Sequence, residues 1–221
     1  MFSSAVGRLL EFFSEKGENP VFLAMGDSII SDCYPGPGYG VAALVQRALE
    51  PVERRGVTRT GYKLPDLEAQ LAGLRGASQC KAGLLSIGGN DLLGLDALPD
   101  EAWFRDFSGR YLALRRDLSR LYPGARWLVC NLYDPTDGTG RLPGREERGF
   151  PPRPGLVECV LHLNQAIAEV AGPDLVDLHS YCAGHGWSRR LPLWFQMDIE
   201  PNREGARQIA DLLLKRLQVR P

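Results

Sequence analysis

Short apolar runs alternate along the chain with longer segments in which apolar residues recur at helical spacing. Runs typical of buried strands occupy residues 20–25, 57–60, 81–87, 126–131 and 174–178. Segments with helical periodicity occupy residues 39–49, 64–74, 100–121, 156–170 and 202–217. Strands that alternate with helices in this way are joined by right-handed crossovers. The pattern therefore predicts an α/β fold, a three-layer α/β/α sandwich around a five-stranded, mostly parallel sheet.

The composition is that of an ordinary globular domain. The chain has 221 residues, of which 44% are hydrophobic and 24% are charged, so we expect one domain over residues 1–221. A net charge of −1 does not supply the basic surface that nucleic acids require, and no apolar stretch is long enough to span a membrane. Residues 1–18 predict an amphipathic helix rather than an export signal.

The five cysteines are scattered without the spacing of a zinc site or a disulfide framework. They favour a reducing cytoplasm, and we expect no metal and no cofactor. The composition leaves the oligomeric state open.

One long segment lacks apolar periodicity. Residues 138–155 are rich in glycine, proline and arginine. This composition predicts a loop, long enough to act as a lid over the carboxyl edge of the sheet.

Two short motifs follow predicted strands. Gly26-Asp27-Ser28 comes directly after the first strand, and Gly88-Gly89-Asn90-Asp91 comes after the third. The carboxyl ends of strands in an open α/β sheet converge on the crevice where ligands bind, so we expect Ser28 and Asn90 to face one substrate. A serine nucleophile requires a base and also donors for the developing oxyanion, which an asparagine amide supplies.

Together with two further motifs, these residues resemble the SGNH (GDSL-type) hydrolases. The four motifs occur in family order over nearly the whole chain: Met25-Gly26-Asp27-Ser28-Ile29, Thr60-Gly61-Tyr62, Gly88-Gly89-Asn90-Asp91 and Ile199-Glu200-Pro201-Asn202-Arg203-Glu204-Gly205-Ala206. Members of this family are esterases, lipases, thioesterases and carbohydrate deacetylases on a flavodoxin-like sheet. The resemblance implies a small-molecule ester substrate and an acyl-enzyme intermediate. It also implies Ser28 as nucleophile, with the oxyanion held by the backbone N–H groups of Ser28 and Gly61 and the amide of Asn90.

The last motif departs from the family pattern. Where the family carries its catalytic histidine, this chain has Glu200, and Met197 stands where the orienting aspartate should be. Asp198 is present, but one place out of step. The base and its carboxylate partner therefore cannot be carried over by resemblance.

The three histidines are the first candidates for a substitute base. His162 lies inside the predicted helix 156–170 and is interpreted as structural, whereas His179 and His185 lie in the stretch between the fifth strand and the last motif. We slightly prefer His185, because its flanking glycines permit an exposed, unusually turned backbone. Trp187 and Trp194 in the same stretch are expected to anchor it to the core.

Carboxylates supply the remaining alternatives. Asp177, Asp198 or Glu200 would orient the imidazole through its second nitrogen. Glu200 itself ranks second as a direct base, because a carboxylate suits this task only if burial raises its pKa to roughly 6–7. The third alternative is a pseudoenzyme that keeps the oxyanion pocket and binds an acyl or acetylated ligand without turnover.

Overall fold

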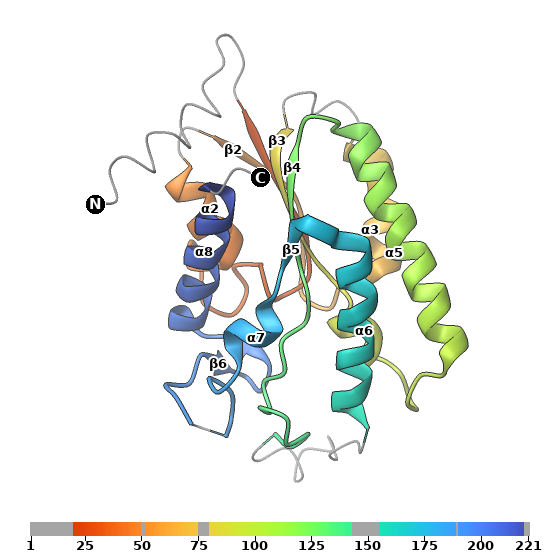
Figure 1. Ribbon diagram of the computed structural model, residues 1–221. Helices are drawn as coiled ribbons and strands as arrows, with labels where there is room; N and C mark the ends of the chain where they lie inside the picture. The colour runs from red at the N-terminus through yellow and green to blue at the C-terminus, as the bar shows by residue number, and fades with distance from the viewer. Residues whose placement is uncertain (1–19, 50–51, 75–79, 143–154, 189, 219–221) are drawn as a thin grey trace.

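The fold is seen in a computed structural model that describes residues 20–49, 52–74, 80–142, 155–188 and 190–218 (Figure 1). The helix expected at 1–18 and most of the lid expected at 138–155 lie outside the described residues.

A five-stranded sheet forms the centre of the molecule. Its strands are β1 (Val21–Gly26), β2 (Glu53–Thr58), β3 (Cys80–Ser86), β4 (Arg126–Cys130) and β5 (Leu175–Val176). They follow the order β2-β1-β3-β4-β5, and every neighbouring pair is parallel. This order is flavodoxin-like and confirms the predicted fold class. Its switch point, where ligands bind in such sheets, lies between β1 and β3.

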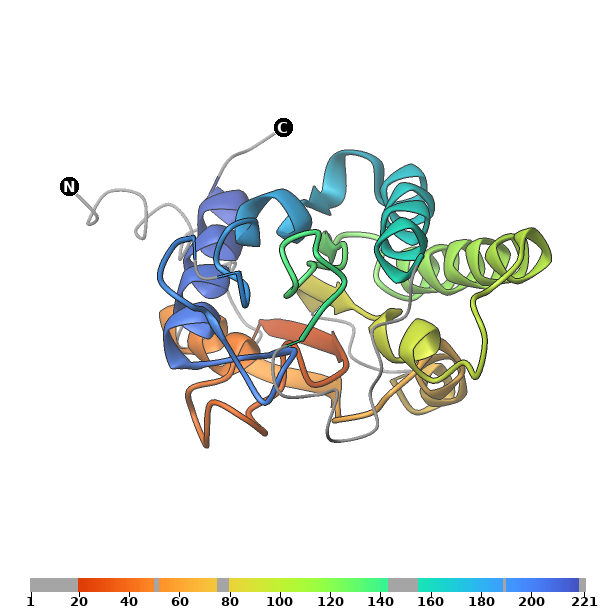
Figure 2. The same ribbon diagram turned by 90° about the horizontal axis from the view of Figure 1, so that it is seen from below.

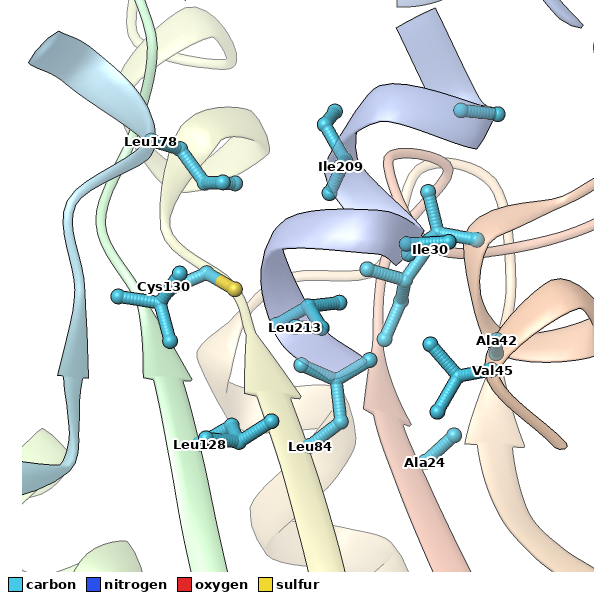
Figure 3. Packing of buried hydrophobic residues seen from close by; sticks show 14 of the residues in the cluster. Ala24, Ile30, Ala42, Val45, Leu84, Leu128, Cys130, Leu178, Ile209 and Leu213 are labelled. Atoms are coloured by element: carbon cyan, nitrogen blue, oxygen red, sulfur yellow. The ribbon is translucent and has the colours of Figure 1, made fainter. Parts of the chain in front are cut away.

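Helices cover both faces of the sheet (Figures 1 and 2). One face carries α2 (Val41–Ala48) and α8 (Arg203–Gln218), and the other carries α3 (Leu64–Gln70), α5 (Glu101–Leu121) and α6 (Leu156–Ala171). Side chains of β1 alternate between two hydrophobic clusters, Phe22 and Ala24 in one and Leu23 and Met25 in the other. Figure 3 shows the first cluster, where strand residues pack under α2 and α8.

Two strands differ in extent from their predictions. The second strand was expected at 57–60 but occupies Glu53–Thr58. It is an edge strand paired with β1 alone, and its first residues are polar, so the apolar pattern did not reveal where it begins. The fifth was expected at 174–178 but has two residues. Asp174 belongs to a 3-10 turn (Gly172–Asp174), and Asp177 caps α7 (Leu178–Cys182) by accepting a hydrogen bond from Ser180 N.

The periodicity did not predict several short elements. They are α4 (Gly89–Leu93), α7 and an antiparallel hairpin of β6 (Phe195–Gln196) and β7 (Glu200–Pro201). The helix expected at 64–74 is present as α3 followed by a 3-10 turn (Leu71–Leu74). The hairpin turn holds Met197 and Asp198 at φ 47° and 80°, a left-handed region that non-glycine residues rarely adopt. No glycine lies between Phe195 and Pro201, so the sequence has no residue that would mark this tight turn.

Candidate active site

Ser28 lies just beyond the carboxyl end of β1, at the switch point of the sheet. Here the chain passes very close to β3, since a Cβ on Gly26 would lie 2.2 Å from Ser86 O. The Asp27 N–H donates to Ser86 O at 3.2 Å, and the Ser28 carbonyl accepts from Ser31 N at 3.3 Å. Main-chain contacts with the core thus set the position of Ser28, which is buried.

Glu200 is the side chain that meets Ser28. Ser28 Oγ donates to Glu200 Oε1 at 3.0 Å, across 172 positions of sequence. Glu200 is only 5% exposed, and its Oε2 is buried without a partner among the described residues. Burial raises the pKa of Glu200 to about 7, although the hydrogen bond from Ser28 acts in the opposite direction. A carboxylate with this pKa is suited to accept a proton near neutral pH.

Side chains hold the hairpin that carries Glu200. Trp187 Nε1 donates to Asp198 O, Tyr133 OH donates to Ile199 O, and Gln196 Nε2 donates to Pro201 O at 3.0 Å. These three bonds fix main-chain carbonyls on both sides of Glu200 in sequence. The sequence reasoning missed Tyr133, although it lies just past β4 at the sheet edge where site residues gather.

Asp27 is a second buried carboxyl group beside Ser28. It is 1% exposed, and Oδ1 accepts from Ile29 N at 3.0 Å. Burial raises the pKa of Asp27 to about 7, the bond from Ile29 N opposes this, and the negative charges of Glu200 and Asp91 raise the pKa further. The site therefore concentrates acidic groups that hold their protons tightly.

Asn90 and Gly61 are brought together at the neighbouring strand ends. Asn90 lies at the start of α4, and its Nδ2 donates to Tyr62 O at 3.1 Å. Gly61 occupies a turn closed by Tyr62 N to Arg59 O at 3.2 Å, and its φ of +80° explains the glycine. Within the described residues, the N–H groups of Ser28 and Gly61 have no acceptor. Asn90 borders the same pocket as Ser28, and its bond to Tyr62 O brings it beside the turn of Gly61.

The histidines make other contacts. His185 Nδ1 donates to Pro192 O at 2.7 Å, and its ring stacks on Trp194 with centroids 3.4 Å apart. His179 lies in α7, where its backbone N–H donates to Asn131 Oδ1 at 3.1 Å, and its Nδ1 is buried without a partner among the described residues.

The structure therefore does not bring the preferred histidine, His185, or the alternative His179 into a hydrogen bond with Ser28 within the described residues; Glu200 occupies that place. His162 stacks on Phe104 of α5, a structural position. Of the carboxylates considered as orienting groups, Asp177 accepts from Asn131 Nδ2 at 2.8 Å, and Asp198 lies in the hairpin turn.

Comparison with known proteins places the chain in a family. A model of the GDSL-like lipase/acylhydrolase family matches residues 24–208. The chain belongs to this family. No curated protein matches.

Solved structures of two acetyl xylan esterases and a phospholipase share the fold. The acetyl xylan esterase AlAXEase has a TM-score of 0.67 at 17% identity, with 88% of this chain and 98% of that chain covered. Phospholipase A1 from Streptomyces albidoflavus NA297 has a TM-score of 0.66 at 19% identity, with 91% of this chain and 100% of that chain covered. An acetyl xylan esterase from Geobacillus stearothermophilus has a TM-score of 0.65 at 17% identity, with 93% of this chain and 99% of that chain covered.

In this GDSL-like protein an apolar pocket of about 140 Å³ opens beside Ser28. Ser28 and its neighbours Asp27 and Ile29 border it together with Asn90, and the other lining residues come from α4, the segment after β4, the start of α6 and Ile199. Its apolar lining consists of Ile29, Leu92, Leu93, Leu132, Tyr133, Pro135, Leu142, Leu156, Val157, Val160 and Ile199.

The segment after β4 is tied to the stretch that follows α7. The Asp137 carboxylate accepts from Gly184 N at 2.8 Å, from Gly186 N at 3.1 Å and from Ser188 Oγ. In addition, Trp187 N donates to Pro135 O at 2.8 Å. Trp187 thereby connects one wall of the pocket, through Pro135, to the hairpin that carries Glu200.

No group of three or more histidine, cysteine, aspartate or glutamate side chains within the described residues is arranged to hold a metal ion. No helix in the same part of the chain is both long and apolar enough to cross a membrane.

Proposed function

We propose that this chain hydrolyses carboxylic esters through Ser28, with Glu200 in the role that histidine plays in the rest of the family. The observation that carries the proposal is the buried hydrogen bond of 3.0 Å from Ser28 Oγ to Glu200 Oε1. Family membership supports the reaction class, and the raised pKa of Glu200 supports its use as a base near neutral pH.

The reaction proceeds in two halves. Ser28 Oγ attacks the ester carbonyl carbon while its proton passes to Glu200, and the tetrahedral intermediate collapses as the alcohol leaves with that proton. A water molecule then attacks the acyl-enzyme, gives its proton to Glu200 and releases the acid; the proton returns to Ser28 Oγ. The same carboxyl group serves as base and then as acid in each half.

The oxyanion is held by three donors in this proposal. They are the N–H groups of Ser28 and Gly61, which have no acceptor within the described residues, and Asn90 Nδ2, whose bond to Tyr62 O uses one of its two hydrogens. Each donor of this kind contributes on the order of 3 kcal/mol to transition-state stabilisation.

The decisive experiment compares two buried serines. Ser28→Ala is expected to abolish hydrolysis of short-chain aryl esters and labelling by a fluorophosphonate. Ser31→Ala is the matched control, because Ser31 is equally buried and donates to the Ser28 carbonyl at 3.3 Å without touching Glu200. Equal rates for wild type and Ser28→Ala would exclude Ser28 as the nucleophile.

The alternative is a pseudoenzyme, and the replacement of histidine by Glu200 is the observation that favours it. Such a protein would bind an ester in the pocket but neither turn it over nor be labelled at Ser28. Burst kinetics with an aryl ester separate the two, since an acyl-enzyme releases one equivalent of phenol per active site.

A further inference from the structure

We propose that the pocket beside Ser28 binds an unbranched aliphatic acyl chain, so that the substrates are esters of fatty acids of about four to eight carbons rather than acetyl esters. This inference rests on the proposed function, since it names the acyl group that Ser28 would receive. It comes from the position, lining and size of the pocket.

The position of the pocket favours the acyl side of the ester. A leaving alcohol must take its proton from Glu200, so it departs on the side of Ser28 that Glu200 occupies. The pocket is bordered by Ser28 and Asn90 and extends to α4 and α6, and Glu200 is not part of its described lining. The group that stays attached to Ser28 therefore points into the pocket.

The lining favours hydrocarbon. Leu92 and Leu93 of α4 and Val157 and Val160 of α6 line the pocket, and no lysine or arginine takes part among the described residues. The described lining includes two carboxyl groups, Asp27 beside Ser28 and Asp134. Neighbouring residues of the chain engage both oxygens of Asp134. Oδ1 accepts from Thr136 N at 2.8 Å and from Thr136 Oγ1 at 2.6 Å, while Oδ2 accepts from Gly138 N at 2.7 Å.

The size exceeds the needs of an acetyl group. A volume of about 140 Å³ is well above the roughly 10–15 Å³ that one water molecule needs. Several methylene groups therefore fit, and each one that leaves water raises kcat/KM by about three- to fourfold.

The first experiment varies the acyl chain. We expect kcat/KM for p-nitrophenyl hexanoate to exceed that for p-nitrophenyl acetate by at least about tenfold. Ethyl hexanoate and hexyl acetate are isomers that exchange the two sides of the ester, and we expect the hexanoate to be the better substrate. Ser28-dependent turnover with a flat chain-length profile, or with hexyl acetate preferred, would overturn the inference and leave the proposed function standing.

The second experiment fills the pocket. Val160→Phe is expected to lower kcat/KM for the hexanoate by about tenfold or more and to change that for the acetate by less than about threefold. Leu161→Phe is the matched control on the same helix, because Leu161 is 47% exposed and does not line the pocket. Val157→Phe repeats the test from the neighbouring turn if Val160→Phe fails to fold.

A binding measurement separates failure of this inference from failure of the proposed function. In Ser28→Ala protein, methyl hexyl ketone is expected to bind at least about tenfold more tightly than methyl ethyl ketone, with the difference lost in the Val160→Phe background. If no ester is hydrolysed, this result still supports the chain-binding pocket. Equal affinity for the two ketones would refute it.

Discussion

Ser28 and Glu200 meet in one hydrogen bond, but the protein holds them in different ways. Ser28 follows directly from the core of a parallel sheet, where backbone bonds to β3 and a glycine without room for a side chain determine its place. Glu200 lies on a hairpin of two-residue strands, held by Tyr133, Trp187 and Gln196. The position of Ser28 thus follows from the fold, whereas the position of Glu200 depends on a few side chains.

The largest expected effect comes from removing the candidate base itself. Glu200→Gln keeps the shape and an oxygen for Ser28 Oγ but accepts no proton, so kcat is expected to fall by about two to four decades. Glu200→Asp keeps the carboxylate but shortens its reach, so its kcat should lie between those of wild type and Glu200→Gln. Stopped-flow and steady-state assays on an aryl ester measure both. A wild-type rate in Glu200→Gln would exclude Glu200 as base.

The next effect is the pH dependence of the intact pair. In the proposed mechanism the active form is the Glu200 carboxylate. Because the pKa of Glu200 is raised to about 7, kcat/KM should then rise with pH to a plateau above that value. At pH 5 it should be about a hundredfold below the plateau. The residual rate of Glu200→Gln should lack this midpoint. A midpoint near 4.5 in the wild type would contradict the buried, desolvated state of the carboxyl group.

The same burial should be visible in stability. A folded-state pKa raised above the unfolded value stabilises the protein at low pH, and this contribution is lost as pH rises through about 7. Glu200→Gln should therefore unfold with a free energy about 1 to 3 kcal/mol higher than wild type at pH 8 and nearly equal to it at pH 4. Urea titrations at the two pH values provide the measurement. A variant less stable than wild type at pH 8 would argue against the desolvation of Glu200.

A smaller effect tests the side chains that hold the hairpin. Tyr133→Phe removes the bond to Ile199 O, and we expect kcat to fall by about three- to tenfold with little change in KM. Tyr122→Phe is the matched control, because Tyr122 OH donates to Leu74 O at 2.6 Å, a main-chain carbonyl remote from the site. Equal losses of stability with equal rates would show that Tyr133 has no part in positioning Glu200.

The smallest effect is expected at the preferred histidine of the sequence analysis. His185 donates to Pro192 O and stacks on Trp194, so His185→Ala should lower stability and change kcat by less than about threefold. A loss of a hundredfold without unfolding would return His185 to the role of base. The pH profile of the variant should keep its midpoint.

The sequence predicted where Ser28 and Asn90 lie in the sheet. Both follow apolar runs that form β1 and β3, so apolar periodicity places them at strand ends. Gly61 was proposed only through the resemblance to the family. The hairpin could not be predicted in this way. Strands of two residues are too short to show an alternation of apolar and polar residues. Met197 and Asp198 adopt left-handed backbone without the glycine or asparagine that usually marks it.

The order of the candidate bases could not be read from the sequence either. The usual pKa of a glutamate disfavours it as a base, and only tertiary burial changes that value. The glycines beside His185 suggested an exposed side chain. In the structure these glycines instead bring their N–H groups to Asp137.

The bonds around Asp137 and Trp187 have a consequence for motion. Pro135 in the wall of the pocket and Asp137 just after it are joined to the stretch 184–188, and Trp187 in that stretch is joined to the hairpin. We therefore expect the pocket to widen and Glu200 to move in one cooperative opening rather than in two independent fluctuations. The amide hydrogens of Gly184 and Gly186 report on this opening, since they exchange with solvent only when their hydrogen bonds to the Asp137 carboxylate break. A ligand that fills the pocket should slow that exchange at both glycines together.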